Sequence, residues 1–145
     1  MSDLFIVATD GSDASNAALD YAAEQAKKAG AELVLVNVID WSGYEVMGPE
    51  EAARRHKRRE EEIARAKQEV IDPALERVRK HGIEAENIIR HGHSATVLIE
   101  LVNESNARQV FVGRHGHSKL GELFFGSTTH TLVQACPVPV TVVPK

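Results

Sequence analysis

The sequence contains almost no cysteine and no long run of apolar residues. Cys136 is the single cysteine, so no disulfide can form within the chain, and we expect it to be a small core residue. A lone thiol fits the reducing cytoplasm, where we expect the protein to act. Apolar runs fall well short of the roughly 20 residues that a membrane span needs, and the N-terminus lacks the basic region and apolar core of a signal peptide. We therefore expect no membrane partner.

A strong excess of either charge is also missing. The net charge of −4 does not favour nucleic acid or an anionic surface as a partner. Residues 54–59 are basic, but glutamates flank them on both sides, so we interpret this segment as a solvated helix face. With 145 residues, 43% of them hydrophobic, the chain suits one globular domain, which we expect to span residues 1–145.

Two familiar nucleotide-binding fingerprints are absent. A Gly-x-Gly-x-x-Gly motif should follow the first strand, where this chain has Asp10-Gly11-Ser12. Residues 121–128 come within one position of a Walker loop, but Ser127 stands where the lysine would reach the β- and γ-phosphates. We therefore interpret residues 121–128 as part of a different phosphate loop.

Five apolar segments alternate with helical patterns along the chain. The segments that predict strands are residues 4–9, 33–38, 85–91, 109–112 and 138–143. Apolar positions at helical spacing predict helices within residues 14–26, 50–80, 94–102 and 127–135. The third strand is more polar and the fifth contains Pro139, so both belong at sheet edges. The pattern predicts a single-domain α/β fold with an open, parallel five-stranded sheet and helices on both faces.

Several residues mark helix ends. Ser12 or Asp13 would cap the first helix, which Gly30 would end. Ser94 would cap the helix after the third strand. Asp72-Pro73 predicts a kink, or a restart with Asp72 as the cap and Pro73 at the first helical position.

One segment carries both halves of a phosphate cradle. Gly113 and Gly116 follow a predicted strand, and Gly126-Ser127-Thr128 precedes a predicted helix. Glycines let backbone N–H groups approach an anion, and a helix start adds unpaired N–H groups, hydroxyls and a positive dipole end. Ligands of such sheets bind beyond the carboxyl ends of the strands, where Asp10 and Val38 also fall. The segment therefore predicts nucleotide binding.

Four features together resemble the universal stress protein family. They are Asp10-Gly11-Ser12, the strand end at residues 36–40, the pattern Gly113-x2-Gly116-x9-Gly126-Ser127, and the C-terminal residues 137–143. The likeness covers essentially the whole chain, and the glycine pattern resembles that of the ATP-binding branch. It implies a Rossmann-like adenine nucleotide-binding fold with sheet order 3-2-1-4-5, a stress-response role and an unidentified regulatory partner. It also implies a homodimer through the apolar edge strand 138–143, and such edges tend to pair.

The resemblance implies that three residues meet the adenosine. Asp10 would contact it with Ala8 close by, and Val38 would recognise the adenine edge through its backbone. A carboxylate can accept hydrogen bonds from ribose hydroxyls. The alternatives are that Asp10 only caps the following turn and that Val38 is only a core residue.

The same resemblance assigns the phosphates to the glycine segment. Gly113, His115 and Gly116 would line the ribose and phosphates, and Gly126-Ser127-Thr128 would hold the phosphate chain. The expected ligand is ATP, with AMP or ADP as alternatives, and Mg²⁺ or Mn²⁺ would accompany the phosphates. The alternative is that the glycines only satisfy turn geometry.

An exact repeat is not explained by the resemblance. Residues 90–94 (Arg-His-Gly-His-Ser) recur as residues 114–118, each after a predicted strand. Their histidines could form a metal site or contact phosphate. In the expected order two strands lie between the third and the fourth, so three steps of about 4.8 Å separate the two copies, which is too far for one metal ion. We therefore predict no metal site from His91, His93, His115 and His117.

The prediction is an ATP-binding regulatory protein. The alternatives are a slow ATPase or phosphotransferase, a histidine-based metal-binding module, and an interaction domain with an empty pocket. Since the chain lacks a Walker lysine, an evident Asp–metal pair and a positioned base apart from the loop histidines, we predict no catalytic residue.

Overall fold

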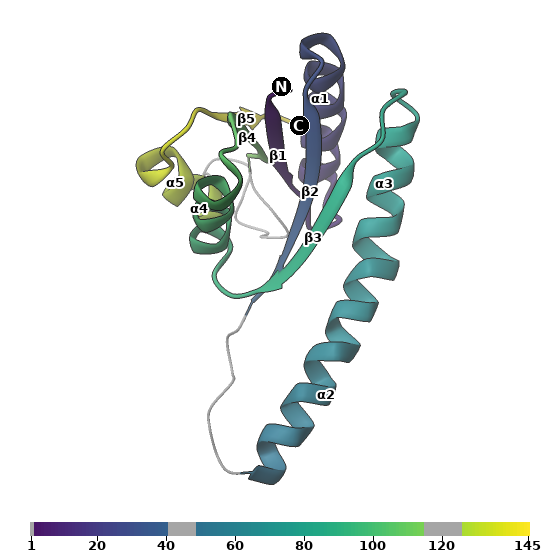
Figure 1. Ribbon diagram of the computed structural model, residues 1–145, viewed down its shortest axis with the longest axis vertical. Coiled ribbons are helices and arrows are strands. Elements are labelled where there is room, and N and C mark those ends of the chain that lie inside the picture. Colours follow the sequence, from purple (N-terminus) through teal and green to yellow (C-terminus); the bar gives the residue numbers. More distant parts are fainter. Residues whose placement is uncertain (1, 41–48, 115–125) are drawn as a thin grey trace.

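The chain folds as a parallel sheet between helices (Figure 1), seen in a computed structural model that describes residues 2–40, 49–114 and 126–145. The strands are β1 (Leu4–Ala8), β2 (Glu32–Ile39), β3 (Glu86–His91), β4 (Gln109–Gly113) and β5 (Val140–Val143). The helices are α1 (Asp13–Ala29), α2 (Pro49–Ala66), α3 (Asp72–Arg79), α4 (Ser94–Ser105) and α5 (Ser127–Ala135), and a π-helix (Lys67–Ile71) joins α2 to α3. The predicted strands and helices are confirmed, with ends that differ by a few residues.

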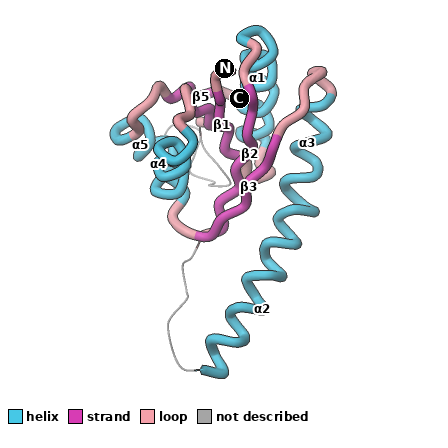
Figure 2. Tube along the Cα trace, viewed as in Figure 1, coloured by secondary structure: helices cyan, strands magenta, loops and turns pink. Residues whose placement is uncertain are grey.

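The five strands are arranged in the order β3-β2-β1-β4-β5, and every pairing is parallel. The central strand β1 places Val7 beside Leu35 of β2 and Phe111 of β4. The predicted order and the edge positions of β3 and β5 are confirmed. Figure 2 shows the strands of this sheet between the helices, and because all of them point the same way, their carboxyl ends share one edge.

Each face of the sheet has its own apolar core. Since successive side chains of a strand point to opposite faces, neighbours in sequence belong to different cores. The strand residues that face α1 and α3 are Phe5, Val7, Leu33, Leu35, Phe111 and Val143. Those that face α4 and α5 are Ile6, Val34, Val36, Val110 and Val112. Helices therefore cover both faces, as the alternation predicts.

Three of the predicted helix ends can be compared with the structure. Ser12 caps α1, where its Oγ accepts a hydrogen bond from the N–H of Ser15 at 3.1 Å, and Gly30 ends this helix with a left-handed φ of 66°. The prediction for α4 is wrong. Ser94 is already helical there, and His93 occupies the N-cap position without a side-chain hydrogen bond. Its extended backbone places His93, rather than Ser94, at the boundary.

The break near Asp72-Pro73 takes the form of a π-helical turn. It comes directly before α3, which begins at Asp72, so Pro73 is the second residue of the helix and not the first as predicted. The predicted cap is wrong: Asp72 makes no capping hydrogen bond, and its carboxylate accepts from Lys67 Nζ at 3.0 Å instead. Proline lacks the N–H that would continue the regular ladder, which explains why the irregularity lies here.

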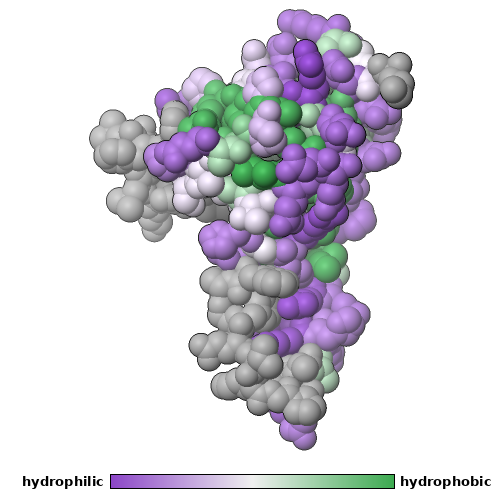
Figure 3. All heavy atoms as spheres, turned by 60° about the vertical axis from the view of Figure 1, so that its left-hand side comes forward, coloured by the Kyte–Doolittle hydropathy of each residue, from purple (hydrophilic) through white to green (hydrophobic). Residues whose placement is uncertain are grey.

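Helix α2 extends beyond the sheet into solvent (Figure 1). The basic residues Arg54, His56, Lys57 and Arg58 are exposed there, as expected of a solvated helix face. His56 contacts Glu60 and Arg58 contacts Glu62 along it, and the coloured atoms in the lower part of Figure 3 belong mostly to hydrophilic residues. Within the described residues no helix is both long and apolar enough to cross a membrane.

Candidate functional site

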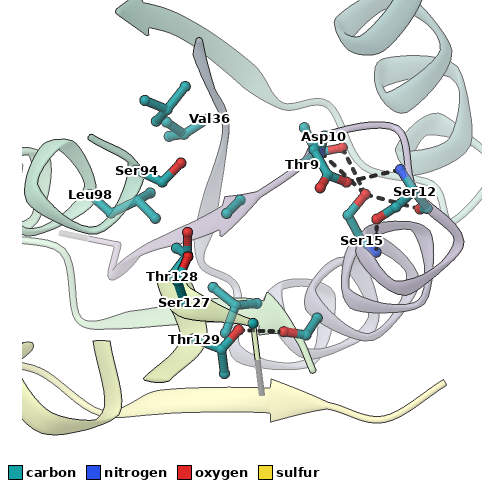
Figure 4. Close-up of a pocket in the computed structure, with 15 residues that line it drawn as sticks. Thr9, Asp10, Ser12, Ser15, Val36, Ser94, Leu98, Ser127, Thr128 and Thr129 are labelled. Atoms are coloured by element: carbon teal, nitrogen blue, oxygen red, sulfur yellow. Dashed lines mark hydrogen bonds between the residues drawn. The ribbon is translucent and has the colours of Figure 1, made fainter. Parts of the chain in front are cut away.

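A cavity of about 240 Å³ lies at the carboxyl ends of β1, β2 and β4 (Figure 4). The first residues of α4 and α5 complete its wall. Its lining residues are Ala8, Thr9, Asp10, Ser12, Ser15, Val36, Val38, Ser94, Leu98, Val112, Gly113, Gly126, Ser127, Thr128 and Thr129. This is the edge at which parallel α/β sheets bind their ligands.

Seven of the nine predicted site residues line this cavity together. They are Ala8, Asp10, Val38, Gly113, Gly126, Ser127 and Thr128. The other two, His115 and Gly116, lie outside the described residues. The fold thus brings β1, β2 and the start of α5 to one place, although the chain separates them widely.

About half of the residues that line the cavity were not predicted from the sequence. Among these unpredicted lining residues, Val36 could have been inferred from Val38, because residues two apart in a strand face the same side. Ser12 could have been found from its cap position. No local pattern marks Leu98 or Thr129, which reach the cavity through the packing of α4 and α5.

The cavity wall is apolar on one side and polar on the other. Val36 and Leu98 lie opposite the turn that carries Thr9, Asp10 and Ser12 (Figure 4). Ligand pockets usually combine an apolar surface with a few placed polar groups. Such a wall suits a ligand with one flat apolar part and one hydroxyl-rich or charged part.

Hydrogen bonds fix the Asp10 turn. The Oδ1 of Asp10 accepts from the N–H of Ser12 at 2.9 Å, and the N–H of Asp10 donates to Ser15 Oγ at 3.3 Å. Ser15 Oγ in turn donates to the carbonyl of Ser12 at 3.0 Å. Gly11 between them has a φ of 83°, which favours glycine. Asp10 therefore does cap its turn, and the same turn holds it at the cavity wall.

A buried amide holds the end of β1 in place. The Nδ2 of Asn37 donates to the carbonyl of Thr9 at 2.8 Å, and the N–H of Thr9 donates to the carbonyl of Val36 at 2.9 Å. Both Thr9 and Asn37 are buried. Because buried polar groups need partners, these bonds restrict how far the Asp10 turn can move relative to β2.

Gly113 lies where β4 passes very close to the start of α1. A Cβ at this position would be 2.7 Å from the carbonyl oxygen of Ala14 and 2.8 Å from its carbonyl carbon. Gly113 is not among the glycines with a positive φ, so close packing, and not turn geometry, explains this glycine.

The start of α5 forms the floor of the cavity. Gly126 is the N-cap residue, and its N–H donates to the carbonyl of Arg114 at 3.1 Å. The N–H groups of Ser127, Thr128 and Thr129 follow in the first turn, where they have no acceptor within the helix. With the positive end of the helix dipole, this turn can bind an anion.

The histidine repeat is divided between separate places. His91 ends β3, and its Nε2 lies 3.0 Å from Glu62 of α2 with a side chain only 8% exposed. His93 is exposed at the start of α4, and His115 and His117 lie outside the described residues. Across residues 2–40, 49–114 and 126–145, no three His, Cys, Asp or Glu side chains are placed to hold a metal ion.

Comparison with known proteins gives a consistent family. The sequence matches the universal stress protein family over residues 1–144. A relative, the universal stress protein YxiE of Bacillus subtilis, is 30% identical over an alignment of 150 positions that covers 99% of this chain and 99% of the relative.

Solved structures share the fold at lower sequence identity. The universal stress protein UspA from Lactobacillus plantarum has a TM-score of 0.83 at 23% identity, covering 97% of each chain. One from Archaeoglobus fulgidus, solved in complex with dAMP, has a TM-score of 0.69 at 19% identity, covering 99% of this chain and 98% of that one. A third, in complex with cAMP, has a TM-score of 0.65 at 24% identity, covering 97% and 95%. The chain belongs to the universal stress protein family.

Proposed function

We propose that this protein binds an adenine nucleotide in the cavity, preferentially ATP with Mg²⁺ or Mn²⁺, and acts as a cytoplasmic, nucleotide-dependent regulator. The observation that carries the proposal is the meeting of an apolar wall, the Asp10 turn and the α5 N-terminus around one cavity. Family members solved with dAMP and cAMP support the same class of ligand.

The two sides of the cavity suit the two parts of a nucleotide. The base would lie against the apolar wall, with the backbone of Val38 at its edge and Ala8 below. Asp10 would accept hydrogen bonds from ribose hydroxyls. Ser127 and Thr128 would bind phosphate oxygens through N–H groups and hydroxyls, and His115 and Gly116 would complete the phosphate loop.

The cavity is smaller than a typical ligand pocket, so we expect part of the phosphate chain to extend from the α5 floor beyond it. Its volume of about 240 Å³ is small for a whole nucleotide, since ligand pockets usually measure roughly 300–1,000 Å³. Asp10 is the one carboxylate among the described lining residues. A divalent cation would therefore be held chiefly by phosphate oxygens and water, as is usual for Mg²⁺.

The direct test is to identify what the protein carries. The protein would be purified without added nucleotide and denatured, and released small molecules identified by chromatography and mass spectrometry. Near-stoichiometric ATP would support a binding protein that hydrolyses slowly, whereas ADP or AMP alone would favour an enzyme or another ligand preference. An empty protein would be titrated with ATP and Mg²⁺ or Mn²⁺ by calorimetry. Absence of heat would contradict the proposal.

Substitutions in α5 test the phosphate assignment. Gly126→Val would crowd the loop, and Ser127→Ala would remove a hydroxyl. Each is expected to weaken ATP binding about tenfold or more: Gly126→Val because its side chain blocks close approach to the backbone, and Ser127→Ala because a hydrogen bond to a charged group contributes about 1.5–3 kcal/mol. Thr131→Ala, which removes an exposed hydroxyl from the same helix outside the cavity, is the matched control. If both Gly126→Val and Ser127→Ala bind ATP with wild-type affinity, the start of α5 does not bind the phosphates.

We also propose that β5 joins two copies into a homodimer. This strand ends the described sheet, and Val140 and Val142 are only partly buried there. An apolar edge strand tends to pair with another chain, and two identical edges can cover each other about a symmetry axis. Val140→Lys is expected to give monomers in light scattering, and an unchanged dimer mass would refute this interface.

A further inference from the structure

Two hydrogen bonds tie the start of α5 to the end of β4. The hydroxyl of Thr129 donates to the carbonyl of Gly113 at 2.8 Å, drawn as a dashed line in Figure 4. The N–H of Gly126 donates to the next carbonyl, that of Arg114, at 3.1 Å. The consecutive carbonyls of Gly113 and Arg114, at the end of β4, therefore bind two residues at the start of α5.

The bond from Thr129 leads out of its own helix. Within helices, Ser and Thr hydroxyls commonly bond to a carbonyl of the preceding turn. Here the hydroxyl reaches a strand 16 positions away in the sequence. Thr129 is only 3% exposed, so its hydroxyl has little access to water as a substitute partner. The bond is therefore a tertiary contact between the two elements that line the cavity.

The position of Gly113 is also restricted by α1. The carbonyl of Ala14 in α1 lies so close to Gly113 that no Cβ would fit between them. The end of β4 is thus fixed on one side by α1 and bonded on the other side to α5. The chain itself does not fix this distance, since residues 114–126 separate Gly113 from the first residue of α5.

We propose that Thr129 is a positioning residue for phosphate binding. Its hydroxyl sets the α5 N-terminus at the distance from Gly113 at which the N–H groups of Ser127 and Thr128 converge on one phosphate group. This inference rests on the proposed nucleotide function. It adds a residue whose hydroxyl does not donate to the phosphate, because its one proton is already donated to the carbonyl of Gly113.

The test compares two substitutions of similar size. Thr129→Val keeps the shape and removes the hydroxyl, and Thr129→Ser keeps the hydroxyl and removes a methyl group. Calorimetry with ATP and Mg²⁺ is run beside calorimetry with adenosine, which has no phosphate. We expect Thr129→Val to lose about tenfold in ATP affinity, since the start of α5 loses its side-chain hydrogen bond to the partly buried carbonyl of Gly113. Its adenosine affinity should stay within about twofold of wild type, and Thr129→Ser should restore most of the ATP affinity.

Each outcome decides the question. Wild-type ATP affinity in Thr129→Val overturns the inference, and so does an equal loss for ATP and adenosine, which marks a general structural role. If Thr129→Val does not fold, as shown by its thermal melting, Thr129→Ala is compared with Thr129→Ser in the same way. A wild-type protein that binds neither compound refutes the proposed function itself, whereas wild-type binding with an unaffected valine variant refutes only the role of Thr129.

Discussion

Replacing Gly113 by alanine is expected to damage both the stability of the protein and its nucleotide site. The new methyl group would be 2.7 Å from the carbonyl oxygen of Ala14 and 3.0 Å from its Cβ. Real Cβ atoms do not approach a backbone oxygen so closely, so β4 or α1 must move. Both elements adjoin the cavity, through Gly113 itself and through Ser12 and Ser15 at the start of α1.

The expected loss of stability follows from two opposing effects. Overpacking costs about 1–3 kcal/mol, and the upper part of this range applies because the Ala14 backbone cannot rotate away as a side chain could. Alanine also restricts the unfolded chain, which returns about 0.4–1 kcal/mol. The net loss in unfolding free energy is then about 2 kcal/mol. For a domain of this size, that lowers Tm by about 6 °C.

Urea denaturation of wild type, Gly113→Ala and Gly30→Ala measures this difference. Gly30 is the matched control because it ends α1 with a φ of 66° and has open space around its Cβ position. Its replacement should cost about 1 kcal/mol through backbone strain alone. Gly30→Ala should leave ATP affinity unchanged, whereas Gly113→Ala should lower it. An unfolding free energy of Gly113→Ala within about 0.5 kcal/mol of wild type would refute the close approach.

Two further predictions concern hydrogen bonds outside the α5 floor. Asn37→Leu should lower the unfolding free energy in urea by about 1–3 kcal/mol, because the buried Thr9 carbonyl loses its donor; an unchanged midpoint would contradict this. The pKa of the Asp20 carboxyl is lowered: burial opposes its ionisation, but hydrogen bonds from Arg77 and His81 outweigh that effect. A lowered folded-state pKa contributes stability above the ordinary value of 3.8 and loses it as the pH falls through the folded-state pKa. Wild type should therefore be more stable than Asp20→Asn near neutral pH, by about 1 kcal/mol or less because the pair is partly exposed, and this difference should vanish in acid. A difference that persists or grows below the ordinary value would refute this account.

Local patterns were sufficient where one element decides its own structure. The apolar run of residues 4–9 predicts a buried central strand, and β1 is that strand. Residues 127–135 are helical as predicted, and Ser12 and Gly30 end α1 as expected. These features depend on side-chain alternation, helical spacing and short-range capping, all of which are visible within a few residues.

Local patterns failed where neighbouring elements compete for a residue. Ser94 has the chemistry of a cap, but the backbone of α4 already includes it. The sequence predicts a break at Asp72-Pro73, but nothing in the composition of Lys67–Ile71 indicates that it takes the form of a π-helix. The close packing that requires glycine at position 113 was also not evident, because Ala14 contacts Gly113 only once β4 and α1 have packed together.

The sequence by itself determined the α/β class, the edge strands and most of the residues that we expect to bind a nucleotide. Its periodicity sets which faces must be buried, and the parallel topology brings the strand ends to one edge. Only the tertiary structure decided which distant groups meet there: Leu98 in the cavity wall, Asn37 on the Thr9 carbonyl, and Thr129 on the carbonyl of Gly113. These contacts depend on packing between elements far apart in the chain, and no local pattern records the distance between them.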